Sequence, residues 1–254
     1  MKHPTLKKFL KRKNNIMTWK EVWSNTECNY YSRAKILNFS PRTLEDLIEI
    51  MDFDISSEDW EKNISVVMET SCNDIPKNIL EVGCGAGAWL FPFYKMGSRV
   101  SGVDFLPYLI ECAKSIMPEG RFYSADADEA LFGEEKFDLI LCNSVFQYFR
   151  SYEYAEKVLI NMLSHLGDSG ACLLTDLFCE DKKDEYKKFR IDELKISEEE
   201  WDRRYSSSGH LYLNRDRIKS LCSQNGFNAK IINNRFIGYN HSKFRFDLMI
   251  RREK

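Results

Sequence analysis

The 254-residue sequence contains no apolar run of the roughly 18 or more residues that a membrane-spanning helix needs. It also lacks the layout of a signal peptide, because its N-terminal basic residues continue through Lys13 and no long apolar stretch follows them. Hydrophobic residues make up 43% of the chain and charged residues 30%, a balance typical of a folded globular protein. We therefore expect a cytoplasmic protein without a transmembrane segment.

Cysteine pairs and metal-ligand spacings are missing as well. The eight cysteines form no C-x-x-C pair, and none of the four histidines stands at a metal-ligand spacing. Several cysteines fall inside apolar segments, where a free thiol packs as a small hydrophobe. The sequence therefore predicts reduced cysteines, with neither a disulfide framework nor a metal site.

The chain also lacks the excess of basic charge that is typical of nucleic-acid-binding proteins. Its formal net charge is −2, so we expect no nucleic-acid partner for the molecule as a whole. Residues 1–20 differ, with seven Lys and Arg residues and no acid, and Leu6, Phe9 and Leu10 can form one apolar face there. This segment is compatible with a helix on a membrane surface or on RNA, and also with a solvated terminus, which is the simpler interpretation.

The pattern of apolar residues changes near Pro76. Residues 19–70 indicate helices, and the Ser40-Pro41 pair predicts that one of them begins at the proline. After Pro76, short apolar runs alternate with helical segments, which is typical of a parallel sheet with helices on both faces. The predicted strands are 78–82, 99–103, 120–124, 137–142, 170–175, 229–237 and 244–251. The predicted helices among them are 87–96, 106–116, 152–164 and, opened by Asn214, 214–225.

These patterns predict an α/β domain over residues 76–254 and a helical cap over residues 1–75 before it. A mostly charged segment, residues 180–213, follows the fifth predicted strand, and its interspersed apolar residues indicate a helical insertion. The cap and the insertion are the two segments that we expect to cover the functional site and exclude water from it.

The most informative motif follows the first predicted strand and reads Ile79-Leu80-Glu81-Val82-Gly83-Cys84-Gly85-Ala86-Gly87. A buried strand runs into a glycine-rich turn and then into a helix, whose first N–H groups have no partner within the helix. Glycines let a ligand approach the backbone closely. Because ligands of such sheets bind beyond the carboxyl ends of the strands, the motif predicts a cofactor at this turn.

A glycine turn of this kind occurs with more than one cofactor. Gly83, Gly85 and Ala88 satisfy the dinucleotide pattern, so an NAD(P)-dependent oxidoreductase is one alternative. No Tyr-x-x-x-Lys constellation follows the fourth predicted strand, however, and too little chain remains for a second nucleotide-binding half with a catalytic domain. The run E-V-G-C-G-A-G resembles instead the first motif of the class I S-adenosylmethionine-dependent methyltransferases. A non-catalytic binding protein with the same fold is the remaining alternative.

The resemblance covers residues 76–180 and implies a seven-stranded, mostly parallel Rossmann-like sheet whose last strand is antiparallel. It implies that the glycine turn packs against the aminoacyl part of S-adenosylmethionine and that Glu81 helps to place the ammonium group. It further implies that Asp104 binds the ribose and Asp126 the adenine amino group; Asp128 is a weaker candidate. The cofactor-binding set is then Glu81, Gly83, Cys84, Gly85, Gly87, Asp104, Phe105, Leu106, Asp126, Ala127, Asn143 and Ser144.

The methyl acceptor is narrowed mainly by a missing motif. Enzymes that methylate amino groups of DNA bases carry N/D-P-P-Y/F after the fourth strand, where this chain reads Asn143-Ser144-Val145-Phe146. We therefore expect a small-molecule acceptor, methylated at oxygen in preference to nitrogen and without a metal. Gln147 and Tyr148 are predicted beside the methyl group. The family often folds an N-terminal segment over the cofactor, and Tyr30, Tyr31 and Arg33 occupy the corresponding segment, where ordinary helix packing is the alternative.

A hydroxyl acceptor needs a base, and topology selects among the histidines. His165 ends a helix before the fifth strand, so it lies at the edge of the sheet opposite the cofactor. His210 ends the insertion, and His241 lies between the last two strands; both belong to the cofactor edge. We predict His241, with His210 as second candidate, as the catalytic base, against the alternative that each is an ordinary loop histidine.

Overall fold

The computed structural model describes most of the chain from residue 40 onward. The described residues are 40–51, 53, 55–129, 132–205, 209–232, 236–238 and 241–253. The predicted cap residues Tyr30, Tyr31 and Arg33 and the basic segment 1–20 lie outside them. In the part of the chain that is described, no helix has the length and apolar character needed to cross a membrane.

A seven-stranded sheet forms the centre of the molecule, in the order β3-β2-β1-β4-β5-β7-β6. Strands β1 to β5 are parallel, and β7 is antiparallel to both β5 and β6. The predicted topology, with its antiparallel last strand, is confirmed. The strands are β1 Asn78–Val82, β2 Arg99–Asp104, β3 Arg121–Ser124, β4 Phe137–Asn143, β5 Leu166–Phe178, β6 Phe227–Ile232 and β7 Arg245–Arg252.

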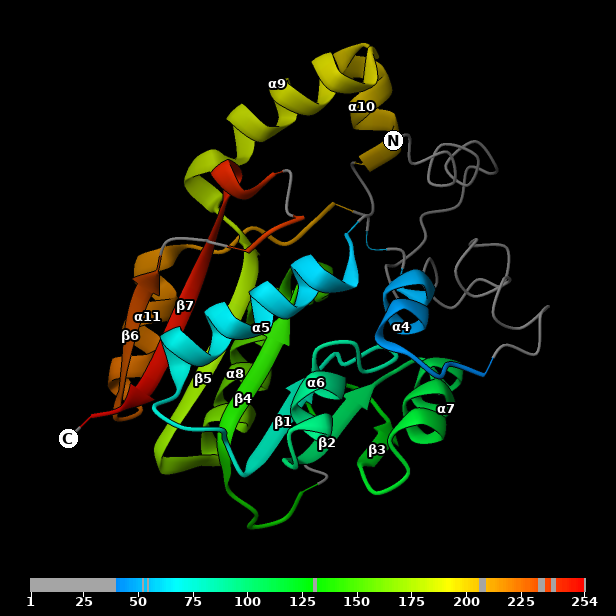
Figure 1. The fold of residues 1–254 in the computed structure, drawn as a ribbon. Coiled ribbons are helices and arrows are strands. Elements are labelled where there is room, and N and C mark those ends of the chain that lie inside the picture. The colour runs from blue at the N-terminus through cyan, green and yellow to red at the C-terminus, as the bar shows by residue number, and fades with distance from the viewer. Residues whose placement is uncertain are drawn as a thin grey trace.

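Helices cover both faces of this sheet (Figure 1). The α-helices of the described residues are α4 Leu44–Ile50, α5 Ser57–Ser71, α6 Leu90–Lys95, α7 Pro107–Ile116, α8 Tyr152–Ser164, α9 Lys183–Leu194, α10 Glu198–Tyr205 and α11 Arg215–Gln224. Short 3₁₀ turns are η1 Phe146–Tyr148, η2 Glu180–Lys182 and η3 Ser242–Phe244. Helices α4 to α7 pack on one face, and α8 and α11 on the other. Helices α9 and α10 form the insertion and project beyond the carboxyl edge of the parallel strands.

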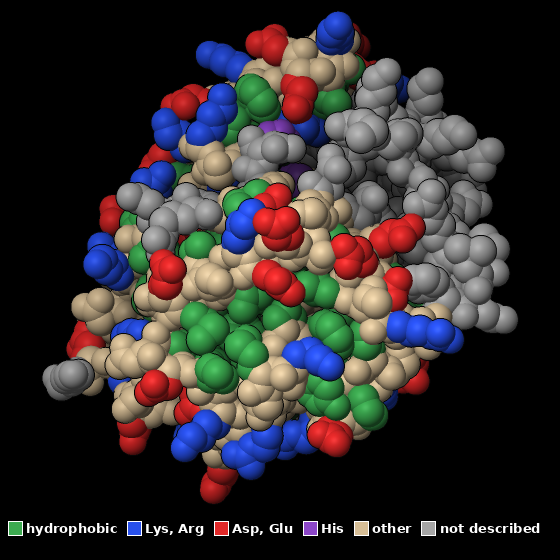
Figure 2. Space-filling model, viewed as in Figure 1, with side chains coloured by type: hydrophobic (Ala, Val, Ile, Leu, Met, Phe, Trp, Pro, Cys, Tyr) green, Lys and Arg blue, Asp and Glu red, His purple; other side chains and the backbone are tan. Residues whose placement is uncertain are grey.

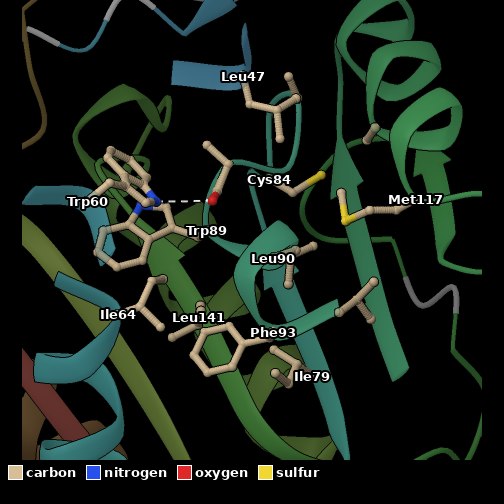
Figure 3. Packing of buried hydrophobic residues seen from close by; sticks show 14 of the residues in the cluster. Leu47, Trp60, Ile64, Ile79, Cys84, Trp89, Leu90, Phe93, Met117 and Leu141 are labelled. Carbon is tan, nitrogen blue, oxygen red and sulfur yellow. Dashed lines mark hydrogen bonds between the residues drawn. The ribbon is translucent and has the colours of Figure 1, made fainter. Parts of the chain in front are cut away.

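The alternation of side chains along the strands builds a separate core on each face. On β4, Leu139 and Leu141 pack with α5 and α6, whereas Ile140 packs with α8. Helix α5 is held to the glycine turn by Trp60, whose indole N–H donates to the Ala88 carbonyl oxygen at 3.0 Å (Figure 3). The face that carries α5 is therefore joined directly to the segment where the cofactor motif lies.

The helix predicted at Pro41 begins three residues later. The Thr43 side chain accepts a hydrogen bond from the Asp46 N–H at 3.1 Å, and Asp46 accepts one from the Thr43 N–H at 2.9 Å. This capping box fixes the start of α4 at Leu44, so the prediction that placed Pro41 at a first helical position is wrong.

Two predicted strands also differ in extent. Strand β6 begins at Phe227 and ends at Ile232, and Ile237, the last residue of the predicted 229–237 strand, is in a turn. Strand β5 is longer than predicted and runs from Leu166 to Phe178. Leu166 pairs with Phe137 of β4 at its start, and Leu177 and Phe178 pair with β7 beyond the end of β4.

Candidate functional site

The glycine motif forms a tight turn between β1 and α6. Gly83, Gly85 and Gly87 all adopt positive φ, at 76°, 52° and 85°, a conformation that side chains other than glycine rarely take. The N–H groups of Gly83 and Cys84 both donate to the carbonyl oxygen of Val103 on β2, at 2.8 and 3.0 Å. The turn is thus fixed against the tip of the neighbouring strand.

A side chain at position 85 would clash, because the Met51 side chain already occupies the space that a Cβ atom would take. A Cβ atom there would lie 2.5 Å from the terminal methyl of Met51. The Met51 sulfur also accepts the Ala86 N–H at 3.4 Å. Met51 directly follows α4, so the end of this helix reaches the glycine turn, a contact that the sequence alone did not predict.

Glu81 is a buried carboxyl group beside the turn. Its side chain is 2% exposed, and its Oε2 accepts no hydrogen bond from the described residues. Burial, followed by the nearby Asp104 carboxylate, raises its pKa well above the ordinary value. A buried acceptor without a partner is costly by itself, whereas an ammonium group placed here would both donate to it and favour its ionised form.

Asp104 stands at the tip of β2 and is half-buried. Its Oδ2 accepts the Gly85 N–H and its Oδ1 accepts the Leu106 N–H, both at 2.9 Å. Burial raises its pKa, and these backbone donors act in the opposite direction. Each carboxylate oxygen has a second lone pair, so Asp104 can still accept from a vicinal diol. Leu106 beside it is buried and Phe105 half-buried, an apolar border next to the acid.

The structure separates the two acids that follow β3. Asp128 forms an ion pair with Lys157 at 2.7 Å, which holds its pKa below the ordinary value. The Asp126 N–H donates to the Glu129 carboxylate at 3.0 Å, and Asp126 and Ala127 are both half-buried. Asp128 therefore has a structural partner, and the adenine role of Asp126 stays a proposal that rests on the family resemblance.

A row of polar side chains crosses the carboxyl edge on the face that carries α5. It consists of Glu81 on β1, Asn143 on β4, Thr175 on β5 and Asp247 on β7. Each lies two residues from an apolar residue of the same core; these are Ile79, Leu141, Leu173 and Met249. Because strand side chains repeat with a period of two, the four polar groups share this face. The apolar core thus ends in a polar rim where a ligand of this fold is expected.

A charged cluster lies where the end of β5 meets β7, next to the tip of β4. Ser144 donates a short hydrogen bond from its hydroxyl to Asp176 Oδ2, and Arg245 pairs with Asp176 Oδ1 at 2.9 Å. The Arg245 guanidinium stacks 3.4 Å above the Phe178 ring. Asp247 accepts the Asp176 N–H at 2.8 Å through Oδ1, while its Oδ2 has no partner among the described residues.

The predicted polar groups after β4 border this cluster. Gln147 is 2% exposed, and Tyr148 lies 5.6 Å from His210 between ring centroids. His210 stacks on Phe178 at 4.4 Å. Burial, and then the positive charges nearby, lower the pKa of His210 to about 3, whereas burial raises that of Tyr148 to about 12. Both groups are therefore neutral near pH 7.

The preferred candidate base, His241, lies beneath the insertion. Its Nε2 is 3.6 Å from a Glu193 carboxylate oxygen, and its ring lies 5.7 Å from that of Tyr186. Figure 2 shows histidine side chains between the insertion and the body of the molecule. Burial lowers the pKa of His241. His165 lies at the opposite edge as predicted, where its Nδ1 contacts the Glu135 carbonyl oxygen at 3.1 Å.

The site can now be compared with known proteins. A family model described as a methyltransferase domain matches residues 54–230. A ubiquinone biosynthesis O-methyltransferase of Rickettsia conorii is 27% identical over 113 residues, 43% of this chain and 38% of that protein. A malonyl-acyl-carrier-protein O-methyltransferase of Bacillus cereus is 26% identical over 167 residues, 63% of this chain and 58% of that protein. The chain thus spans less than two thirds of the length of these relatives.

A solved structure gives the same fold. The magnesium protoporphyrin IX methyltransferase of Synechocystis, with bound S-adenosylhomocysteine, aligns with a TM-score of 0.58 over 92% of this chain and 100% of that one. The sequence identity is 16%, so the likeness concerns the arrangement of the chain.

Proposed function

Because the chain belongs to the class I S-adenosylmethionine-dependent methyltransferase family, we propose that it transfers the methyl group of this cofactor to a small-molecule acceptor. The observation that carries the proposal is a grouping at one edge of the sheet: the positive-φ glycine turn, the buried Glu81, whose Oε2 has no partner among the described residues, and the strand-tip Asp104. The cofactor supplies a methyl group on a positively charged sulfur. The chain's part is to bind it, orient the acceptor and take up any proton released.

The cofactor-binding residues follow from this grouping. Glu81 and the turn Gly83–Gly87, with Cys84, would hold the aminoacyl part, and Asp104 the ribose hydroxyls. Phe105, Leu106, Asp126 and Ala127 would surround the adenine. Asn143 and Ser144, at the tip of β4, would lie beside the methionine part; Asn143 is already positioned by a 2.7 Å hydrogen bond from Thr175.

A binding experiment tests the cofactor class against the oxidoreductase alternative. We expect S-adenosylhomocysteine to raise the melting temperature of the full chain and to bind with a measurable dissociation constant in calorimetry, and NAD to do neither. Stabilisation by NAD alone would contradict the proposal, since a ligand stabilises only the state that it binds.

The role of Glu81 gives a sharper prediction. Glu81→Gln removes the charge that would face the cofactor's ammonium group, and we expect about tenfold weaker binding of S-adenosylhomocysteine, since a charge-assisted hydrogen bond contributes about 1.5–3 kcal/mol. 5′-Methylthioadenosine lacks the aminoacyl part and should bind both proteins equally. A similar loss for the two ligands would place Glu81 outside the aminoacyl site.

For the acceptor we propose a small molecule methylated at oxygen, with nitrogen as the alternative. Two relatives in the comparison carry the name O-methyltransferase, which supports the same preference in this chain. Tyr30, Tyr31 and Arg33 stay a proposed cover, and Gln147 and Tyr148 proposed acceptor contacts. The test is S-adenosylhomocysteine release with 3,4-dihydroxybenzoate, glucosamine and dodecanoate as hydroxyl, amine and carboxylate probes; faster turnover with the amine would overturn the oxygen preference.

A further inference from the structure

The strongest unexplained feature is an irregularity between β5 and β7. Leu174 pairs with Leu248 and Leu177 pairs with Phe246, so two residues of β5, Thr175 and Asp176, stand opposite the single residue Asp247. This is a β-bulge, a device that is frequent beside active sites because it re-aims a side chain. The side chain re-aimed here is the Asp176 carboxylate, at the carboxyl edge of the sheet.

The backbone on both sides of this carboxylate is strained. Asp176 has φ 60° and Ser144, at the tip of the adjacent β4, has φ 55°. Only three residues other than glycine adopt positive φ in the described ranges, and these two are hydrogen-bonded to each other. Strain of this kind is held in place only by surrounding contacts and is concentrated at functional sites.

The contacts that hold Asp176 are all specific. Asp247 accepts its N–H, Arg245 pairs with Oδ1, and the Ser144 hydroxyl donates to Oδ2. Asp176 is 8% exposed and the Arg245 side chain also 8% exposed, so this ion pair is shielded from water. Three residues therefore position Asp176. Among them, Ser144 connects the Asp176 carboxylate to the tip of β4 through its hydroxyl.

We propose that Ser144 and Asp176 form the proton-accepting pair for the methyl acceptor. This rests on the proposed function and places the acceptor group next to the Ser144 oxygen. As the acceptor's oxygen or nitrogen bonds to the methyl carbon, the carbon–sulfur bond breaks and its electron pair stays on sulfur. The acceptor's proton passes to Ser144 Oγ, and the Ser144 proton passes to Asp176 Oδ2, which later releases it to water.

The charges around the pair suit this role. The groups that face Asp176 are Ser144 after β4, Tyr148 on η1, Tyr186 on α9, and Arg245 and Asp247 on β7. Arg245 favours the carboxylate form, while burial, the larger effect, raises the pKa of Asp176 and makes it a stronger base than an ordinary carboxylate. Because the positive charge of Arg245 is paired with the Asp176 carboxylate, these five residues leave no unpaired positive charge that would bind an anionic acceptor.

A proton-accepting pair at this place selects the class of acceptor. The accepted group carries a proton that it loses on methylation, so it is a hydroxyl or a primary or secondary amine. Ser144 and Asp176 are thus an alternative to the predicted bases His241 and His210. His210 stacks on Phe178 with a pKa lowered to about 3, which makes it a weak base, and His241 faces Glu193.

Asp176→Asn is the decisive variant, because asparagine has the same shape and tolerates positive φ. With the faster of the hydroxyl and amine probes, we expect turnover to fall about 100- to 1,000-fold, within the usual contribution of a general base. Faster turnover of the carboxylate probe, which has no proton to lose, would contradict the proposal. The dissociation constant for S-adenosylhomocysteine should change less than twofold, which keeps the proposed cofactor site intact. In Ser144→Ala, turnover should fall only about tenfold, since a water molecule can replace the hydroxyl.

The pH profile separates proton acceptance from a structural role. The wild-type rate should rise with pH through the pKa of the pair, because only the carboxylate accepts a proton, and this limb should be missing in Asp176→Asn. The matched control is Asp138→Asn. Asp138 is likewise a strand carboxylate held by hydrogen bonds, here from two backbone N–H groups at 2.9 Å each, but it lies at the opposite edge of the sheet. It should keep the wild-type rate and profile.

Two further results would overturn the proposal. One is an Asp176→Asn protein that keeps wild-type turnover and pH profile while His210→Asn or His241→Asn loses activity. The other needs no acceptor: in the complex with S-adenosylhomocysteine, the ¹³Cγ resonance assigned to Asp176 by its loss in Asp176→Asn should show a carboxylate at pH 8. A carboxyl group that is still protonated there cannot be the base, whatever the probes show.

Discussion

Asp104→Ala is expected to abolish measurable binding of S-adenosylhomocysteine while the chain stays folded. The carboxylate would lose two charge-assisted hydrogen bonds to the ribose, each contributing about 1.5–3 kcal/mol, so affinity should fall about 100-fold or more. Calorimetry measures the dissociation constant, and circular dichroism checks the fold. 5′-Methylthioadenosine should lose affinity as well, because it shares the ribose; this distinguishes Asp104 from Glu81.

A second effect of this substitution has to be separated from the first. Asp104 also accepts the N–H groups of Gly85 and Leu106, so alanine leaves both backbone donors without this partner. Asp104→Asn supplies one acceptor oxygen, enough for one of these two donors, but no charge. If asparagine recovers part of the melting temperature that alanine loses and none of the affinity, the loss of affinity belongs to the ribose contact. Wild-type affinity in both variants would remove Asp104 from the cofactor site.

The sheet and the cofactor edge could be predicted because their signals are local. The strand at Asn78–Val82 and the helix at Tyr152–Ser164 were predicted at their observed boundaries. The tips of β1 and β2 are marked in the sequence by Gly83 and Asp104, each after an apolar run. Parallel strands then bring Glu81 and Asp104 to one edge, as β1 and β2 pair in register from Asn78 to Val82.

The charged cluster could not be predicted because no local pattern marks it. Asp176 and Asp247 are 71 positions apart and meet only through the antiparallel pairing of β5 and β7. The bulge shifts the register by one residue, and an alternation pattern cannot locate such a shift. The sequence Phe244-Arg245-Phe246-Asp247 does place charged residues at alternate positions of a buried strand. That pattern alone does not identify Asp176 as their partner, because the partner depends on the register between β5 and β7.

Asp247 carries the other large expected effect, a dependence of stability on pH. Its side chain is fully buried, and burial, together with the Asp176 charge, raises its pKa from 3.8 to about 7. The folded state therefore holds this proton more tightly than the unfolded chain does. Below about pH 4 the group is neutral in both states, and its stabilising effect is complete; it is lost as the pH rises from about 4 through about 7.

Asp247→Asn should remove this dependence. Asparagine can still accept the Asp176 N–H and has no charge to bury, so its free energy of unfolding should exceed that of the wild type at pH 8 and match it near pH 4. One pKa unit corresponds to about 1.36 kcal/mol, so the difference approaches about 4 kcal/mol. Urea denaturation of both proteins at several pH values between 4 and 8 measures this difference in the free energy of unfolding. The contributions of the other titrating groups cancel when one protein is subtracted from the other.

Asp247→Leu separates the charge from the hydrogen bond. Leucine removes the buried charge and also leaves the bulge N–H of Asp176 unpaired, a cost of about 1–3 kcal/mol that is the same at every pH. Its curve should therefore run parallel to that of Asp247→Asn and below it. A difference between wild type and Asp247→Asn that stays constant from pH 4 to pH 8 would mean that Asp247 does not titrate in this range. The Asp247 carboxylate would then be ionised next to the Asp176 carboxylate, and the single positive charge of Arg245 would have to compensate both acids.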